Sequence, residues 1–167
     1  MSTLSPGFIT ASTFHPIIAN KSSLGQGAHT LAKTIAMERA YLTGDLSEEV
    51  IEYYNFTNKH VEWGQDHERE AIEAFERQEL LIVDKTNENQ ESIVSDKYSW
   101  LSCTPDGLIS NNALVEAKCP SNPANHLNHI LGDWEKNYIN QVKFQLFVSE
   151  REYGYLVSYD KRYYCNP

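Results

Sequence analysis

The sequence predicts an α/β (α+β) domain, in which strands at the centre are flanked by helices. Short apolar runs bounded by turn residues predict strands near residues 99–103 and 113–119. Apolar residues at helical spacing predict helices that begin near Trp63 and Trp134. With 167 residues and 41% hydrophobic content, the chain can bury one core, so we expect a single domain over residues 1–167.

The expected elements follow one another as helices around a group of short strands. A helix over about 27–41 is predicted because Ala32, Ile35 and Ala36 fall at helical spacing. A short helix fits at Pro123, which suits a first helical turn, and Gly132 would end it. The other expected elements, in chain order, are a helix over 10–18, an acidic connection over 45–59 with a short helix capped by Ser47, a helix opened by Trp63, strands near 80–84, 93–95, 99–103, 108–109 and 113–119, a helix over about 134–149, and a strand over 153–159.

The residues around the strand 113–119 carry the chemistry. In a strand, alternate side chains share a face, so Glu116 and Lys118 should project together. Asp106 leads an Asp-Gly turn after the preceding strand, and the hairpin should bring it back toward Glu116.

Two carboxylates and an ammonium in this arrangement are the minimal set for metal-dependent cleavage of a phosphodiester. Mg²⁺ prefers oxygen ligands and keeps several waters, so Asp106, Glu116 and the main-chain carbonyl of Ala117 would suffice to bind it. Lys118 would then stand beside a metal-bound water. The alternative is a surface hairpin with an ordinary Glu/Lys alternation, because both patterns are common.

Two helices carry polar side chains among apolar neighbours. Glu68 falls at helical spacing with Ile72 and Phe75, so its carboxylate lies on the apolar stripe. A charge there is costly unless it is paired or bound to metal, and a salt bridge to Lys or Arg is the alternative to a metal role. Gln141 and Gln145 share a face of the later helix. They indicate either a polar cluster aimed at the site or a solvated helix edge.

These residues, with further motifs in the same order, resemble the bacteriophage lambda exonuclease family of the PD-(D/E)xK nuclease superfamily. The resemblance runs over nearly the whole chain and implies a restriction-endonuclease-like core with a central mixed sheet flanked by helices. The matching motifs are Ile9-Thr10-Ala11-Ser12, His29-Thr30-Leu31, Leu42-Thr43-Gly44, Trp63-Gly64-x-x-x-Glu68-x-x-Ala71, Ser102-Cys103-Thr104-Pro105-Asp106-Gly107-Leu108, Glu116-Ala117-Lys118-Cys119-Pro120, Gln141-Val142-x-x-Gln145 and Tyr159-Asp160.

The resemblance implies a metal centre. Asp106, Glu116 and the Ala117 carbonyl would bind the metal that activates water, and Glu68 would help to hold a second metal on the leaving-group side. The implied cofactor is Mg²⁺, with Mn²⁺ as a substitute and two ions per site, because paired metals stabilise both the attacking and the leaving oxygen.

The resemblance also assigns the residues that act on water and DNA. Lys118 would act on the nucleophilic water, steered by Gln141, and either Gln141 or Lys118 would also contribute to the 5′-phosphate site. The side chains expected to bind DNA or its terminal phosphate are Ser12, Thr104 and Gln145.

The chain departs from the family at its N-terminus. The family carries an arginine a few residues before Thr-Ala-Ser that grips the terminal phosphate, whereas this chain has Ser5 there and no arginine before Arg39. A serine cannot make that charge-assisted contact, so the 5′-phosphate preference and processivity stay open. The domain is also expected to be shorter at its C-terminus than the family usually is. The elements concerned contribute to the homo-trimer ring that the family implies.

Composition excludes several classes of protein. A net charge of −9 argues against a generic basic nucleic-acid binder. The three cysteines, Cys103, Cys119 and Cys165, lack CxxC spacing, so we expect reduced thiols and no iron–sulfur cluster. His126 and His129 are expected on a helix surface, with a metal role as the alternative.

The sequence contains no long apolar run and no signal-peptide pattern. The expected location is therefore the cytoplasm, that of a prokaryotic host for a viral protein.

The function expected from these observations is a Mg²⁺-dependent 5′→3′ exonuclease on double-stranded DNA ends, serving phage or viral recombination. A single-strand annealing recombinase is an expected partner. One alternative is an endonuclease or nicking enzyme of the same fold, which the missing arginine favours. The other is a non-catalytic, acidic binding protein on a nuclease scaffold.

Overall fold

The computed structural model describes residues 7–18, 24–45, 59–86 and 92–163. Seven strands, four α-helices and one short 3-10 helix lie in these ranges. Their bounds are β1 Ile9–Thr10, η1 His15–Ile17, α1 Ala28–Leu42, α3 Lys59–Glu79, β2 Lys85–Thr86, β3 Ile93–Val94, β4 Leu101–Cys103, β5 Gly107–Ile109, β6 Ala113–Lys118, α4 Pro123–Ile130, α5 Lys136–Ser149 and β7 Tyr153–Ser158.

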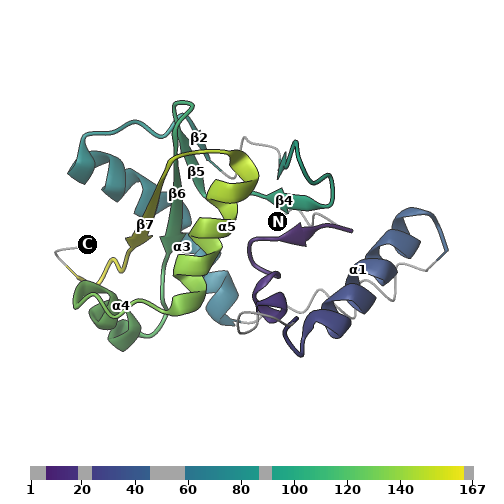
Figure 1. Cartoon of the computed structure of the whole chain (residues 1–167). Helices are drawn as coiled ribbons and strands as arrows, with labels where there is room; N and C mark the ends of the chain where they lie inside the picture. Colours follow the sequence, from purple (N-terminus) through teal and green to yellow (C-terminus); the bar gives the residue numbers. More distant parts are fainter. Residues whose placement is uncertain (1–6, 19–23, 46–58, 87–91, 164–167) are drawn as a thin grey trace.

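A mixed four-stranded sheet forms the centre, in the order β2-β5-β6-β7. β5 and β6 form an antiparallel hairpin, and β6 pairs with β7 in parallel. Figure 1 shows α5 in front of this sheet and α3 behind it. A second, three-stranded sheet in the order β1-β4-β3 lies beside it. The α+β class is confirmed, although the strands divide into two hydrogen-bonded sheets.

Side chains of β6 alternate between the two helices. Leu114 packs in a cluster with Val142 of α5, whereas Val115 packs with residues of α3. Glu116 and Lys118 share the face of Leu114, because residues two apart in a strand point the same way. The predicted alternation is therefore correct, and it turns both charged side chains toward α5.

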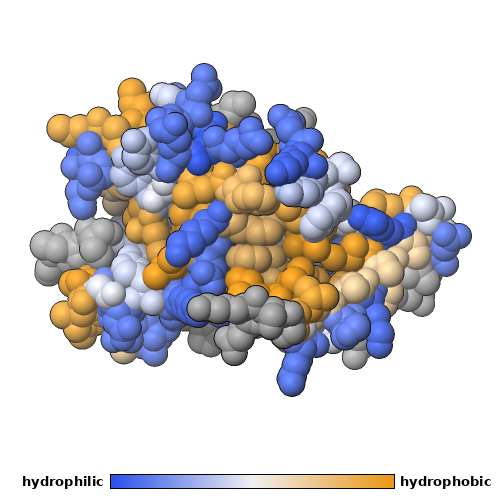
Figure 2. All heavy atoms as spheres, viewed as in Figure 1, coloured by the Kyte–Doolittle hydropathy of each residue, from blue (hydrophilic) through white to orange (hydrophobic). Residues whose placement is uncertain are grey.

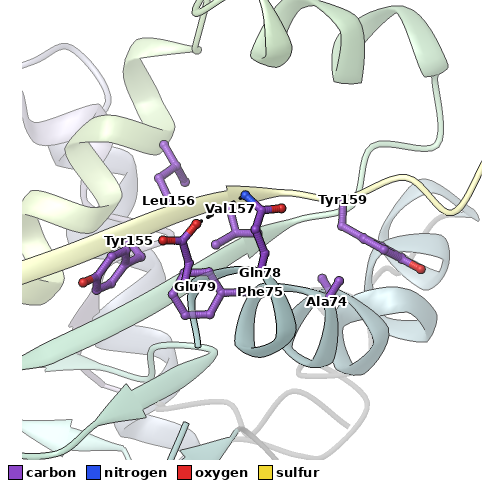
Figure 3. Close-up of a pocket in the computed structure, with 9 residues that line it drawn as sticks. Ala74, Phe75, Gln78, Glu79, Tyr155, Leu156, Val157 and Tyr159 are labelled. Atoms are coloured by element: carbon purple, nitrogen blue, oxygen red, sulfur yellow. Dashed lines mark hydrogen bonds between the residues drawn. The ribbon is translucent and has the colours of Figure 1, made fainter. Parts of the chain in front are cut away.

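The neighbouring strand β7 shows the same alternation (Figure 3). Leu156 points away from α3, while Val157 points toward it. A pocket of about 180 Å³ lies between α3 and β7. It is lined by Ala71, Ala74, Phe75, Gln78, Glu79, Tyr155, Leu156, Val157 and Tyr159, so none of the carboxylates predicted to hold metal lines it.

The prediction of a helix over residues 10–18 was wrong. Ile9 pairs in parallel with Leu101 of β4, and only the turn His15–Ile17 is helical. The Thr13 hydroxyl accepts a hydrogen bond from the Thr10 amide at 3.1 Å. Such local side-chain bonds compete with helix formation, so the chain turns directly after β1.

The helix predicted over 27–41 is confirmed as α1. It is held to the start of the described chain through Gly7, whose carbonyl accepts from Arg39 Nε at 3.0 Å and from Nη2 at 2.9 Å. The Gly7 amide donates to Glu38 at 2.9 Å. The acidic connection predicted over 45–59 lies almost wholly outside the described residues.

The start of α3 and the strand after it differ from the prediction. α3 begins at Lys59, one turn before the expected Trp63. The strand expected near 80–84 is found at Lys85–Thr86, because Leu80 takes a left-handed φ of +55° and turns the chain after the helix. The segment reaches the sheet at Asp84, whose amide donates to the Leu108 carbonyl at 2.8 Å.

The C-terminal elements follow the prediction closely. Asn122 caps α4 by accepting from the Ala124 amide at 3.0 Å, and Pro123 occupies the first turn. Gly132 has a φ of +82°, which suits the chain reversal after α4. α5 begins at Lys136 rather than Trp134, since Glu135 still has an extended ψ.

Hydrophobic residues gather near the middle of the face shown in Figure 2, with hydrophilic residues around them. The exposed apolar side chains of α5 include Ile139 and Phe147, at 38% and 55% exposure. None of the helices described is both long and apolar enough to span a membrane.

Gly154 tests the packing of β7 under α5. A Cβ there would lie 2.4 Å from Val142 Cγ1 and 3.3 Å from Leu146 Cδ1, so Gly154→Ala should overpack the interface and lower the free energy of unfolding by about 1–3 kcal/mol. Gly64→Ala is the matched control, because that Cβ would meet nothing within 4 Å. It should stabilise α3 by about 0.5–1 kcal/mol. Urea unfolding measures both, and equal effects would contradict the packing described.

Candidate active site

Asp106 lies where the chain crosses from one sheet to the other. β4 belongs to the three-stranded sheet and β5 to the four-stranded one, so the hairpin that approaches Glu116 is β5–β6. The amide of Ala117 donates to Asp106 Oδ2 at 2.7 Å, and the Asp106 side chain is 8% exposed. This bond continues the hairpin beyond its last paired residues and confirms that Asp106 returns to β6 beside Glu116.

The carbonyl of Ala117 faces the same edge of β6 as its amide. In an antiparallel ladder, the N–H and C=O of one residue point to the same neighbouring strand. The Ala117 amide points to Asp106, while the next carbonyl, that of Lys118, points to β7 and accepts from the Tyr159 amide at 2.9 Å. The Ala117 carbonyl oxygen is therefore directed toward the side where Asp106 lies.

Both oxygens of Glu116 accept hydrogen bonds from α5. Gln141 Nε2 donates to Oε1 and Gln145 Nε2 donates to Oε2, each at 2.6 Å. Residues four apart share a helix face, so both amides reach the same carboxylate. Gln145 is only 1% exposed, which excludes the alternative of a solvated helix edge and confirms a polar cluster.

Lys118 completes this cluster. Its Nζ donates to Glu116 Oε1 at 2.6 Å and to Gln141 Oε1 at 3.1 Å. Burial alone would lower the pKa of Lys118, but the carboxylates of Glu116 and Asp106 outweigh it and raise the pKa. Lys118 is therefore an ammonium and a hydrogen-bond donor in this arrangement.

Asp106 stands among negative charges. Burial raises its pKa well above the usual range, and the carboxylates of Glu116 and Glu68 raise it further. Lys118 lowers the pKa, but by less. Glu68, on α3, thus lies close enough to act on Asp106 from the opposite helix. The surroundings of Asp106 are therefore negative on balance, and a bound cation would offset this charge.

The donor set fits a hard divalent cation. In the part of the chain that the structure describes, no three His, Cys, Asp or Glu side chains come together to hold a metal by themselves. Asp106, Glu116 and the Ala117 carbonyl supply oxygen donors at one end of β6, and Mg²⁺ commonly fills its remaining positions with water. The residues present suit such an ion better than zinc, which prefers nitrogen and sulfur ligands.

Ser12 and Thr104 lie at corresponding ends of two paired strands. Thr10 of β1 is the register partner of Ser102 of β4, and both hydroxyl residues come two positions later. Ser12 is exposed, with its Oγ 3.2 Å from Thr10 Oγ1. Thr104 Oγ1 lies 2.7 Å from Ser92 Oγ. Binding of the terminal phosphate by Ser12 and Thr104 stays a prediction.

The DNA contact expected of Gln145 also stays a prediction. The side chain is buried, and its Nε2 donates to Glu116 Oε2, so its observed partner is the carboxylate. Gln145 thereby fixes the orientation of Glu116.

The prediction that His126 and His129 lie on a helix surface was wrong. They are 0% and 3% exposed, and each Nδ1 lies 2.8 Å from Ser158 Oγ. Ser158 is the β7 partner of Lys118, so α4 turns its histidines onto the sheet beside the site. A hydroxyl has one proton, so it can donate to one ring while the other ring donates to it. Nothing in the local pattern singled out Ser158.

Cys103 and Cys119 are free thiols, as expected, while Cys165 falls outside the described residues. Burial, with the charge of Glu116, raises the pKa of Cys103 to about 12. Burial and the charge of Asp106 raise the pKa of Cys119 to about 12. Neither thiol is a nucleophile at neutral pH.

Comparison with known proteins supports a nuclease. The family model described as YqaJ-like viral recombinase domain matches residues 3–152. Among solved structures, the chain is similar to the alkaline exonuclease LHK-Exo from Laribacter hongkongensis, at 22% identity and a TM-score of 0.73, over 94% of this chain and 71% of that one. The structure of LHK-Exo in complex with dAMP matches at 23% identity, with the same TM-score and coverage.

A phage related exonuclease from Haemophilus somnus 129PT is similar at 16% identity and a TM-score of 0.66, over 90% of this chain and 67% of that one. At these identities the structural matches show the fold. Comparison with curated protein sequences gave no match.

The buried histidines predict a pH dependence of stability. Burial lowers the pKa of His126 and of His129 below 6.5, so below that pH the unfolded chain binds more protons than the folded one. The free energy of unfolding should therefore fall as the pH drops from 7.5 to 5, by up to about 1.4 kcal/mol per pH unit for each histidine.

Urea unfolding at several pH values measures this dependence. The double variant His126→Gln/His129→Gln should lose part of the slope, and the difference between the two proteins removes the contribution of other groups. If the free energy of unfolding depended on pH equally in the two proteins, the prediction would be contradicted.

Proposed function

Because the chain belongs to the YqaJ-like viral recombinase domain family, we propose that it is a metal-dependent deoxyribonuclease of phage recombination that hydrolyses double-stranded DNA from a 5′ end. The observation that carries the proposal is the Glu116 carboxylate, held by Lys118, Gln141 and Gln145 beside the buried Asp106. Burying so many polar groups together is costly for a protein that only binds a partner.

The residues of the site divide into metal ligands and groups that orient the substrate. Asp106, Glu116 and the Ala117 carbonyl would hold Mg²⁺ or Mn²⁺, and Glu68 would help to hold a second ion from α3. Bound divalent metal supplies Lewis-acid stabilisation of the attacking and leaving oxygens. Because hydrogen bonds already fix the carboxylates of Asp106 and Glu116, these ligands need not rearrange during the reaction.

Lys118 and Gln141 would orient the attacking water and the scissile phosphate. Lys118 is an ammonium whose hydrogen bonds to Glu116 and Gln141 place it at the edge of the carboxylate. It can donate to a phosphate oxygen or to the water, and holding the two reactants in line accounts for much of the rate of phosphoryl transfer.

Recognition of the DNA end would depend on hydroxyl groups. Ser12 and Thr104 are the candidates for the terminal phosphate, since Arg39 directs Nε and Nη2 to the Gly7 carbonyl. Hydroxyls bind phosphate less strongly than an arginine fork does, so the preference for a 5′-phosphate should be modest. We also propose that the protein assembles as a ring-shaped homo-trimer and that it has an annealing recombinase as partner.

A nuclease assay tests the function directly. The protein with Mg²⁺ should release mononucleotides from linear duplex DNA, leave closed circular DNA intact, and lose activity when EDTA is added. Lys118→Ala should lower kcat by at least about a hundredfold, because a charge-assisted donor at the reacting phosphate is removed. Lys143→Ala, an exposed lysine of α5, is the matched control and should retain activity.

The substrates distinguish the remaining alternatives. Comparing 5′-phosphate with 5′-hydroxyl ends measures how far Ser12 and Thr104 replace an arginine. Nicking of the closed circle would favour an endonuclease of the same fold. A folded protein that degrades none of these substrates with Mg²⁺ or Mn²⁺ would contradict the proposal and leave a binding protein.

A further inference from the structure

We propose that Tyr138 is a positioning residue that holds the Lys118 ammonium against Glu116 by presenting the face of its ring. The inference rests on the proposed function for its effect on catalysis, although its effect on the lysine itself can be measured without any activity. The Lys118 Nζ lies 4.9 Å from the centre of the Tyr138 ring.

The ring lies beside an ammonium that already makes two hydrogen bonds and keeps one proton for a water or a phosphate. An ammonium has three protons, and two of them point to Glu116 Oε1 and Gln141 Oε1. The negative face of an aromatic ring attracts a cation, more strongly when water is excluded. Lys118 therefore has three neighbours that favour its position: a carboxylate, an amide and a ring.

The helix α5 supplies two of these three contacts from one face. Tyr138 and Gln141 are three residues apart, so their side chains lie one above the other on the helix. The helix that orients Glu116 through its glutamines thus also orients Lys118 through Tyr138.

Tyr138 is itself held in place on two sides. Its amide donates to the Glu135 carbonyl at 3.0 Å, and its ring meets that of His129 edge to face, with 5.9 Å between the ring centroids. His129 stacks on Trp134 at 4.2 Å and approaches Ser158 through Nδ1. A ring fixed in this way loses little entropy when it holds the lysine.

These contacts form a continuous network of residues around Lys118. Ser158 is the β7 register partner of Lys118, His129 contacts Ser158, Tyr138 contacts His129, and Lys118 lies over Tyr138. His129 of α4 therefore supports the ring that supports the lysine.

Replacing the ring should misplace the ammonium while leaving DNA binding intact. Tyr138→Leu should lower kcat about three- to thirtyfold with KM little changed, the range that a cation–π contact implies. Tyr138→Phe is the matched control, because it keeps the ring face and loses only the hydroxyl, and it should stay within about twofold of the native protein.

The direct readout is the NMR signal of the Lys118 ε-CH₂ group. Protons above a ring face are shifted upfield, so in the native protein this signal, assigned by its loss in Lys118→Ala, should stand upfield of the other lysine ε-CH₂ signals. Tyr138→Phe should keep the shift and Tyr138→Leu should lose it. Thermal unfolding checks that each variant is folded, and Tyr138→Met, which has no ring but a similar volume, replaces Tyr138→Leu if that variant does not fold.

The inference would be overturned by an unshifted Lys118 signal in the native protein. It would also be overturned if folded Tyr138→Leu or Tyr138→Met kept the native kcat, or if Tyr138→Phe lost as much activity as Tyr138→Leu. The NMR result stands even for a protein without nuclease activity, so failure of the proposed function is distinguishable from failure of this inference.

Discussion

The hydrogen bond from the Ala117 amide to Asp106 Oδ2 is the contact on which the rest of the site depends. Asp106 belongs to the crossing between two sheets, and Ala117 belongs to the central strand β6. The hairpin pairs Gly107 with Val115, and the bond extends this pairing to Asp106. Without it, a buried amide would lose its partner. This 2.7 Å contact therefore holds the end of the crossing at β6 and brings Asp106 beside Glu116.

The strand β6 serves the core and the site at once. Its Val115 and Ala117 pack on α3, whereas Glu116 and Lys118 turn toward the glutamines of α5. Charges on a buried strand are tolerated because each has partners: two amides and an ammonium for Glu116, and a carboxylate, an amide and an aromatic ring for Lys118. Because the apolar side of β6 packs on α3, the strand is fixed in place and its charged side chains stay opposite their partners.

Local patterns in the sequence predicted the parts of the site that depend on local geometry. The shared face of Glu116 and Lys118 follows from strand alternation, and the paired glutamines of α5 follow from helical spacing. The helix expected over residues 10–18 failed because β1 pairs with β4, about ninety residues away, and no local pattern contains that contact. The buried histidines were missed for the same reason, since their partner Ser158 lies on a strand formed later in the chain.

A crystal of the protein soaked in MnCl₂, with anomalous diffraction recorded at the manganese edge, tests the central claim most directly. The proposal that Asp106, Glu116 and the Ala117 carbonyl hold one cation predicts an anomalous peak in contact with all three oxygens. It also predicts loss of that peak in Asp106→Asn, which keeps the shape of the side chain but not its charge. A manganese peak elsewhere in the molecule, or none at these oxygens in the native protein, would contradict the claim.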